Sequence, residues 1–258
     1  MKLRARNSRR RFLGRTLGAT GALALSGCDA LSRSDWFPKL LASAETLNRK
    51  VQPVLAPRSA MAQEFTAADL SPEFRSNGTA MPDNPAYQAL ATGGFADYRL
   101  QVGGLVQRPA SLSLAELRAL PSRTQITRHD CVEGWSAIGK WKGARLAALL
   151  DSIGIKPEAR YVVFHCADPM EANGTAPYYE SIDMDDALHP QTLLAYELND
   201  KTLPIKNGAP IRLRVERQLG YKHAKYVMRI ELVESFARIA GGMGGYWEDQ
   251  GYEWYAGI

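Results

Sequence analysis

Hydrophobic and polar positions alternate along several short segments of the chain, a pattern typical of β-strands with one buried face. The alternation predicts strands over 98–102, 211–215 and 226–233, and a β-branched and aromatic run predicts a buried strand over 160–166. The period of two in 211–215 places Arg212 and Arg214 on one face. Gly103 and Gly104 are expected to end the first strand.

Helical spacing of apolar residues is confined to short stretches. Residues 113–120 begin with Ser113 and carry Glu116 three positions later, the arrangement of a capping box. Residues 145–153 are apolar at helical spacing and are followed by Gly154. Because strands outnumber helices and do not alternate regularly with them, we expect a mixed, strand-rich α+β domain rather than a doubly wound parallel sheet.

The first 27 residues have a different pattern from the rest. They hold seven Lys and Arg residues and no Asp or Glu, and their apolar run over 17–27 is shorter than the roughly 20 residues of a membrane span. The stretch Ser8-Arg9-Arg10-Arg11-Phe12-Leu13 resembles a twin-arginine export signal, and Leu25-Ser26-Gly27-Cys28 resembles a lipobox. We therefore expect a signal peptide over 1–27, a lipid anchor at Cys28 and a periplasmic or otherwise extracytoplasmic protein.

Composition divides the remainder into two parts. Residues 28–64 are rich in Ala, Ser and Pro, with an amphipathic stretch over 40–54, and are expected to form a tether with a short helix. Residues 65–258 are expected to form one catalytic domain. Its Gly-rich and aromatic tail, 241–255, either packs its rings on the body or forms a lid or a docking surface for an electron partner.

The net charge of +5 at first suggests a nucleic-acid partner. The seven basic residues of 1–27 exceed that total, so the rest of the chain carries a net charge of −2. A slightly acidic body gives no general reason to bind a polyanion, and we expect no nucleic-acid partner.

Candidate chemistry is concentrated around Cys131. Arg128 and His129 are expected to favour its thiolate, the form that binds metals and attacks electrophiles. The local pattern leaves three alternatives open: a buried inert cysteine, a nucleophile with His129 or His165 as base, and a disulfide with Cys166.

The stretch Cys131-Val-Glu-Gly-Trp-Ser136 resembles the metal-ligand segment of the sulfite-oxidase family of molybdenum enzymes, nearest to its periplasmic methionine-sulfoxide-reductase catalytic-subunit branch. The resemblance extends over 74–233 and includes several collinear motifs. They are Trp141-Lys-Gly143, Leu146-Ala-Ala-Leu-Leu150, His189-Pro190, Leu193-Leu-Ala195, Asn207-Gly-Ala-Pro-Ile-Arg212 and Gly220-Tyr-Lys-His-Ala-Lys225.

The resemblance implies a molybdenum–molybdopterin cofactor with Cys131 as the metal ligand. It also implies a set of positions that contact the pterin: Phe74, Arg75, Asn77, Cys166, Asn207, Arg212, His223, Ala224 and Lys225. Tyr178 matches a catalytic pocket tyrosine, with Tyr179 as the competing choice.

A cationic cluster within 14 residues suits the terminal phosphate of such a pterin. It consists of Arg212, Arg214, Arg217, Lys222, His223 and Lys225. Gly220 is expected to let backbone N–H groups approach the anion.

One departure from the family bears on the substrate. Sulfite oxidases hold their anion with an arginine at the position where this chain has Ser76. We therefore expect oxygen-atom transfer with reduction of a sulfoxide-type S- or N-oxide. Separately, we expect a monomer that exchanges electrons with a membrane haem protein or cytochrome. A sulfite dehydrogenase of the same fold and a non-catalytic lipoprotein that binds a ligand remain as alternatives.

Overall fold

The computed structural model describes residues 34–37, 39–40, 43, 47, 59–171 and 176–258. The chain divides into two compact units, Met1–Pro57 and Arg58–Ile258, and the fold below is that of the second unit. The expected signal peptide, the lipobox at Cys28 and most of the tether with its amphipathic stretch lie outside the described residues. These expectations, and the boundaries at 27 and 64, stay predictions.

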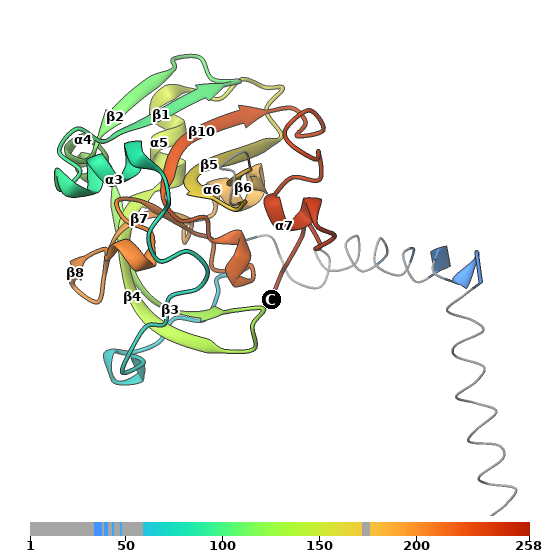
Figure 1. Ribbon diagram of the computed structural model, residues 1–258, viewed down its shortest axis with the longest axis horizontal. Coiled ribbons are helices and arrows are strands. Elements are labelled where there is room, and N and C mark those ends of the chain that lie inside the picture. The colour runs from blue at the N-terminus through green and yellow to red at the C-terminus, as the bar shows by residue number, and fades with distance from the viewer. Residues whose placement is uncertain (1–33, 38, 41–42, 44–46, 48–58, 172–175) are drawn as a thin grey trace, which may run out of the picture. The chain divides into compact units, whose positions relative to one another are not determined.

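A five-stranded sheet with the order β2-β1-β10-β5-β6 forms one layer of the body (Figure 1). Its strands are β1 (Arg99–Gly104), β2 (Ala110–Ser113), β5 (Tyr161–Pro169), β6 (Pro177–Asp183) and β10 (Val227–Val233). β1 and β10 run parallel, and the other neighbours are antiparallel. The parallel pair joins segments that are far apart in sequence, so this sheet brings the end of the domain beside its beginning.

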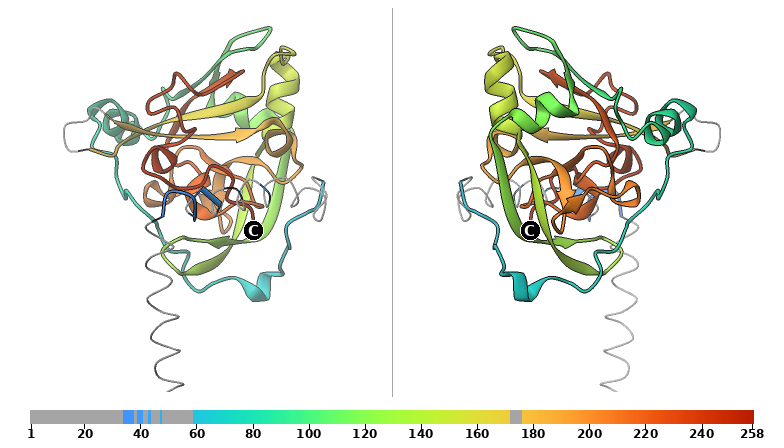
Figure 2. Two further views of the ribbon diagram at one scale, coloured as in Figure 1. Left: turned by 90° about the vertical axis from the view of Figure 1, so that its right-hand side faces the viewer. Right: turned by 90° about the vertical axis from the view of Figure 1, so that its left-hand side faces the viewer.

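A second sheet has the order β3-β4-β7-β8, and β9 also pairs with β7. Its strands are β3 (Ser122–Asp130), β4 (Ser136–Arg145), β7 (Leu193–Leu198), β8 (Lys201–Thr202) and β9 (Arg212–Arg214). β3 and β4 form a long hairpin, seen in green along one side of the body in Figure 2. The turn of this hairpin carries Cys131, which places the candidate ligand at the end of the sheet.

Short helices and 3-10 turns connect the strands. They are η1 (Ala67–Asp69), α3 (Pro85–Thr92), α4 (Leu114–Ala119), α5 (Leu146–Ile153), α6 (Met184–Leu188), η2 (Ile205–Asn207), η3 (Gly220–Lys222) and α7 (Tyr246–Asp249). In α4 the hydroxyl of Ser113 accepts from the N–H of Glu116, and the Glu116 carboxylate accepts from the N–H of Ser113 2.8 Å away. The capping box expected from the sequence is therefore confirmed.

The main core lies between the two sheets and α5. Leu100 and Ile230 of the first sheet, Leu194 and Leu213 of the second, and Leu149 of α5 belong to one buried cluster. Buried positions in β1 and β10 are separated by more exposed ones, so each strand turns one face to the core, whereas β7 is buried along almost its whole length. The strand-rich α+β class expected from the sequence is confirmed.

β1 ends at Gly104, as the glycine pair predicted, but the strand includes both glycines. β1 continues through both glycines because they pair with β10, where Gly104 lies opposite Leu232. Gly104 has a φ of 80°, and a Cβ there would lie 2.2 Å from the Leu232 carbonyl oxygen. Glycine here allows close backbone approach rather than a turn.

Candidate active site

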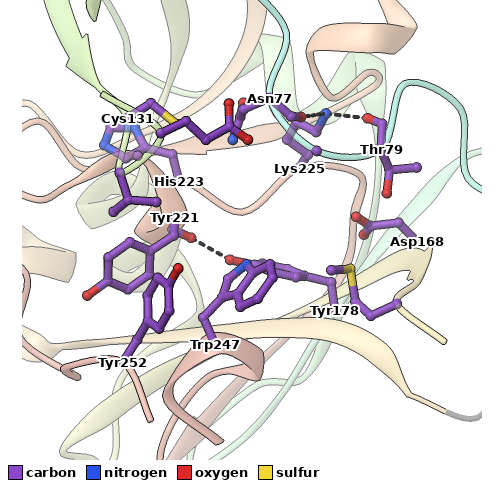
Figure 3. A pocket seen from close by; sticks show the side chains of 15 residues that line it. Asn77, Thr79, Cys131, Asp168, Tyr178, Tyr221, His223, Lys225, Trp247 and Tyr252 are labelled. Carbon is purple, nitrogen blue, oxygen red and sulfur yellow. Dashed lines mark hydrogen bonds between the residues drawn. The ribbon is translucent and has the colours of Figure 1, made fainter. Parts of the chain in front are cut away.

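A cavity of about 180 Å³ lies where six chain segments meet (Figure 3). Its walls come from 77–79, 131–133, 168–170, 220–225 and 247–252, with Tyr178 of β6. Five residues expected at the site line it together: Asn77, Cys131, Tyr178, His223 and Lys225. The structure therefore gathers these residues, distant in sequence, around a single space.

Cys131 lies just after β3 in a tight turn. Its N–H donates to the Trp135 carbonyl at 2.9 Å, and its carbonyl accepts from the Gly134 N–H at 3.0 Å. Burial raises the pKa of the Cys131 thiol, while a backbone hydrogen bond from Glu133 opposes the rise. The expectation that Arg128 favours the thiolate was wrong, because Arg128 is exposed and pairs with Asp130 at 2.9 Å.

Tyr178 points into the cavity from β6, and Tyr179 does not line it, as strand alternation requires. The Tyr178 hydroxyl donates to the Tyr221 carbonyl oxygen at 2.5 Å (Figure 3). Tyr179 instead donates to the Asp249 carboxylate at 2.6 Å. Burial raises the pKa of Tyr178, so its phenol stays protonated at neutral pH. Of the two candidate tyrosines, only Tyr178 reaches the cavity.

Two cations have no carboxylate within ion-pair distance among the described residues: Lys225, which lines the cavity, and Arg212, which lies outside its lining. The ammonium group of Lys225 donates to the carbonyl oxygens of Asn77 at 2.7 Å and Lys206 at 3.0 Å. Burial, followed by repulsion from Arg212, lowers the pKa of Lys225 to about 7. Burial and repulsion from Arg214 lower the pKa of Arg212 to about 9. Nearby carboxylates, Asp168 for Lys225 and Glu216 for Arg212, offset these two pKa shifts only in part.

The rest of the expected cationic cluster is neutralised within the protein. Lys222 lies 2.5 Å from a Glu180 oxygen and 2.6 Å from a Glu248 oxygen. Arg214 is bidentate to Glu216. Arg217 pairs with Asp186. The expectation that all these cations serve one phosphate was therefore wrong for Lys222, Arg214 and Arg217, each of which has its own carboxylate.

Two buried histidines lie edge to face close to Arg212 and Arg214. The rings of His129 and His223 lie 5.0 Å apart at 87°. Arg214 donates to His129 Nδ1 at 3.0 Å, which leaves the proton of that ring on Nε2. Burial, followed by nearby arginines, lowers the pKa of both imidazoles, so both rings are neutral at pH 7. His223 Nε2 donates to the Gln218 carbonyl oxygen at 3.0 Å, so the neutral ring leaves Nδ1 available to accept a hydrogen bond from a ligand without adding charge.

Several buried polar atoms around the cavity have no hydrogen-bond partner. They are His129 Nε2, His223 Nδ1, Asn207 Nδ2, Arg212 Nε and Asp168 Oδ1. Three of these atoms are donors, on His129, Asn207 and Arg212, and two are acceptors, on His223 and Asp168. Buried polar atoms that lack partners are uncommon in folded proteins, and they suggest a polar ligand. Uncompensated cations beside unused donors fit an anionic, heteroatom-rich group such as a phosphorylated pterin.

The other expected pterin contacts do not line the cavity. Asn207 and Arg212 lie behind its wall, where Arg212 donates to the Asn207 carbonyl at 3.2 Å. Ala224 and Cys166 belong to the main buried core. These four roles stay predictions, because no contact to a ligand is present to test them.

Phe74 and Arg75, which were expected to contact the pterin, make their contacts away from the cavity. Phe74 packs edge-on against Trp141, with ring centroids 5.0 Å apart, inside a second small core. Arg75 lies over the ring of Trp135, 5.2 Å from its centroid. Neither lines the cavity, and the pterin contacts expected of Phe74 and Arg75 stay predictions.

The structure also adds residues that sequence reasoning missed. Asp168 projects into the cavity from the end of β5, and burial raises its pKa to about 6. Trp247 and Tyr252 line the opposite side and come from the aromatic tail. The tail had been singled out by its composition, but only its position relative to Cys131 shows that it forms part of this site.

The alternative roles for the cysteines receive no support. Cys131 and Cys166 are both free thiols. His165 lies beside Glu231, with Nε2 and the carboxylate 3.0 Å apart, and does not line the cavity. His129 uses Nδ1 to accept from Arg214, and its Nε2 has no partner in the described chain, so neither histidine is hydrogen-bonded to the Cys131 thiol.

Across the residues that the structure describes, no helix is both long and apolar enough to cross a lipid bilayer.

Comparison with known proteins agrees with this geometry. The chain is 38% identical over 250 residues to the "Putative protein-methionine-sulfoxide reductase subunit YedZ1" of Azospira oryzae, covering 97% of this chain and 88% of that protein. It is 38% identical over 161 residues to the protein-methionine-sulfoxide reductase catalytic subunit MsrP of Xanthomonas axonopodis pv. citri, covering 59% of this chain and half of that protein.

Among solved structures, the sulfane dehydrogenase SoxCD of Paracoccus pantotrophus matches with a TM-score of 0.49 and 24% identity, covering 54% of this chain and 39% of that chain. The family model described as the oxidoreductase molybdopterin-binding domain matches residues 88–238. That span holds Cys131, Tyr178 and Lys225, which meet at the cavity. The chain therefore belongs to the family of molybdopterin-binding oxidoreductases.

Proposed function

We propose that this protein reduces an organic sulfoxide to a thioether, with consumption of two electrons and two protons and release of water. The observation that carries the proposal is the convergence of Cys131, Tyr178 and Lys225 on one cavity, with Arg212 close enough to Lys225 to lower its pKa. The names of the relatives support sulfoxide reduction as the activity.

In this proposal Cys131 binds molybdenum through its thiolate, and the cofactor supplies the two-electron oxygen-atom chemistry. Lys225 and Arg212 hold the anionic part of the pterin, and His223 and Asn77 hydrogen-bond to it. Their buried charges and unused donors support these roles. Cofactor loading also explains how the raised pKa of Cys131 is overcome, because a metal binds the thiolate and releases the proton.

Tyr178 would orient the substrate or a metal-bound group rather than act as a base. Its phenol is protonated at neutral pH, and it donates to the Tyr221 carbonyl in the absence of substrate. A substrate oxygen that competes for this proton would gain a hydrogen bond at little cost, because one acceptor replaces another.

Charge at the cavity favours a neutral sulfoxide over sulfite. The Ser76 hydroxyl donates to the Lys206 carbonyl, and Ser76 does not line the cavity. Glu133 does line it and would repel an anion. A sulfite dehydrogenase and a non-catalytic lipoprotein remain the competing functions, and neither accounts for both Glu133 and the free cations.

The direct test is an activity panel on natively exported protein. With reduced viologen as electron donor we expect turnover of organic sulfoxides, and with ferricyanide as acceptor we expect no oxidation of sulfite. Metal analysis should give one molybdenum per chain. Protein that lacks molybdenum and pterin, or that oxidises sulfite in preference, would overturn the proposal.

Substitution of Cys131 by Ser tests the metal ligand. We expect loss of molybdenum and a fall in activity of more than about 100-fold, beyond what second-shell changes cause. His165→Gln is the matched control, because His165 pairs with Glu231 and does not line the cavity. If His165→Gln removes activity from metal-free protein, the thiol mechanism would replace the metal one.

We further propose export by the twin-arginine route, lipidation at Cys28, a monomeric state and a separate membrane haem protein or cytochrome as the electron donor. The leader sequence supports the first two, and the naming of relatives as subunits supports a partner. Arg9→Lys with Arg10→Lys should retain the protein in the cytoplasm. Cys28→Ser should release exported protein from the membrane fraction, whereas continued membrane association would exclude the lipid anchor.

A further inference from the structure

The C-terminal segment 239–258 lies beyond the matched family domain, which ends at residue 238. It nevertheless contributes Trp247 and Tyr252 to the candidate active site. The segment is therefore a place where this chain can set the properties of its pocket independently of the shared cofactor site.

The segment is fixed to the body by buried polar contacts. Glu248 is 1% exposed and lies 2.6 Å from the Lys222 ammonium group. Asp249 accepts from the Tyr179 hydroxyl at 2.6 Å and from the Gly241 N–H at 2.9 Å. These contacts flank Trp247 on its C-terminal side and hold α7 against β6 and η3.

A second set of contacts fixes the chain after Tyr252. The Trp254 indole donates to Ser181 Oγ at 2.8 Å. The Tyr221 hydroxyl donates to the Glu253 carbonyl at 2.6 Å. The N–H of Ala256 donates to the Gln218 side chain at 2.9 Å. Because both flanks are held, the aromatic side chains between them have a defined position rather than that of a free loop.

The rings form a continuous wall. The ring centroids of Trp247 and Tyr252 lie 5.3 Å apart at 31°, and those of Tyr252 and Tyr221 lie 5.3 Å apart at 89°. Figure 3 shows these three rings grouped on the side of the cavity below Cys131 and His223, with Lys225 and Asp168 on another side. Met170 also lines the cavity. The cavity thus has a polar side with Lys225 and Asp168 and another side that is lined by the three rings.

We propose that Trp247, Tyr252 and Tyr221 form a recognition wall for the apolar substituent of an uncharged organic sulfoxide. This inference rests on the proposed function and adds the substrate class. Aromatic faces bind apolar groups and the thioether sulfur of the product favourably, and they offer no charge to hold an oxyanion. Glu133 at the same cavity strengthens the discrimination against anions.

The test compares two sulfoxides and one analogue that cannot be reduced in this reaction. Trp247→Ala should lower kcat/KM for methyl p-tolyl sulfoxide by roughly tenfold, and for dimethyl sulfoxide by less than about twofold, as expected for loss of one apolar contact. Trp247→Phe, which keeps a ring, should recover most of the difference. Met243→Ala is the matched control, because Met243 is an exposed residue of the same segment and does not line the cavity.

Calorimetric binding of methyl p-tolyl sulfone to the molybdenum-loaded protein provides a readout that does not depend on turnover. We expect Trp247→Ala to weaken it by roughly tenfold. If the sulfone binds in a Trp247-dependent way but no sulfoxide is reduced, the proposed activity fails and the wall stands. If sulfoxides are reduced but Trp247→Ala affects both substrates equally, or neither, the wall is overturned and the activity stands.

Discussion

The ammonium group of Lys222 lies 2.6 Å from the carboxylate of Glu248, and both side chains are almost completely buried. A second buried carboxylate, that of Glu180, lies 2.5 Å from the same ammonium group. One cation therefore joins η3, β6 and α7, three elements that surround the candidate active site. Burial raises the pKa of Glu180, and Lys222 opposes the rise.

Lys222→Met should destabilise the protein by about 3–5 kcal/mol, because removal of one partner leaves buried carboxylates without a cation. Urea unfolding at pH 7 would measure the loss. The control is Lys206→Met, whose ion pair with Glu73 has side chains 51% and 75% exposed, and which should change stability by less than about 0.5 kcal/mol. Equal effects of the two variants would show that the buried group of Lys222, Glu180 and Glu248 contributes no more to stability than an exposed ion pair.

Arg212→Met should separate stability from cofactor retention. Burial lowers the pKa of Arg212 to about 9, so its charge is a cost to the protein without cofactor at pH 7. We expect the free energy of unfolding of the cofactor-free variant to be about 1–3 kcal/mol higher than that of the cofactor-free wild type, as when a buried charge is replaced by an apolar side chain. Molybdenum bound per chain should fall. Exposed Arg118→Met is the control, and a variant that loses stability while retaining molybdenum would contradict the role of Arg212.

Gly220→Ala should disturb the cavity through His129. A Cβ at residue 220 would lie 2.7 Å from His129 Nε2, and the His129 side chain is packed against Phe74, Trp135 and His223. We expect a loss of about 1–3 kcal/mol from overpacking, together with lower cofactor retention. Gly103→Ala is the control, because a Cβ there meets no atom within 4 Å. If both variants match the wild type in stability and in cofactor retention, the close approach of residue 220 to His129 constrains neither property.

Asp168→Asn should change how stability depends on pH in the cofactor-free protein. Burial raises the pKa of Asp168 from 3.8 to about 6. Between these values the folded state binds more protons than the unfolded state, so the wild type loses stability as pH rises. The variant lacks this loss. Its free energy of unfolding should therefore rise by about 2–3 kcal/mol relative to that of the wild type as the pH increases from 4 to 7. Denaturant unfolding across this range measures the difference, and a difference independent of pH would contradict the raised pKa.

Local pattern was enough for those parts of the fold in which one residue type decides the conformation. The capping box of Ser113 and Glu116 and the Gly154 helix end are of this kind, and both occur as expected. α3 was missed although Asn84 accepts from the Tyr87 N–H and Pro85 occupies the first turn, a signal that was present in the sequence. The pairing of Gly104 with Leu232 could not be predicted, because it depends on β10, which lies far along the chain.

The candidate site divides in the same way. Cys131, Tyr178 and Lys225 were found through motifs in one segment each, and the structure brings them to one cavity. Lys222 was expected to hold an anion from outside, since sequence spacing does not reveal that Glu180 and Glu248 lie beside it. Pairings between distant segments are set by tertiary packing, and they decide which cations remain free.

Because six separated segments build the cavity, no single hairpin or helix pair contains it. The parallel pairing of β1 with β10 likewise requires that the ends of the domain meet, and such long-range contacts form late in folding. A chain that is incompletely folded would therefore have the cysteine but not the cavity around it. If the cofactor binds as proposed, its retention reports that the whole domain has folded, so a cell that exports only loaded protein would at the same time be rejecting misfolded copies.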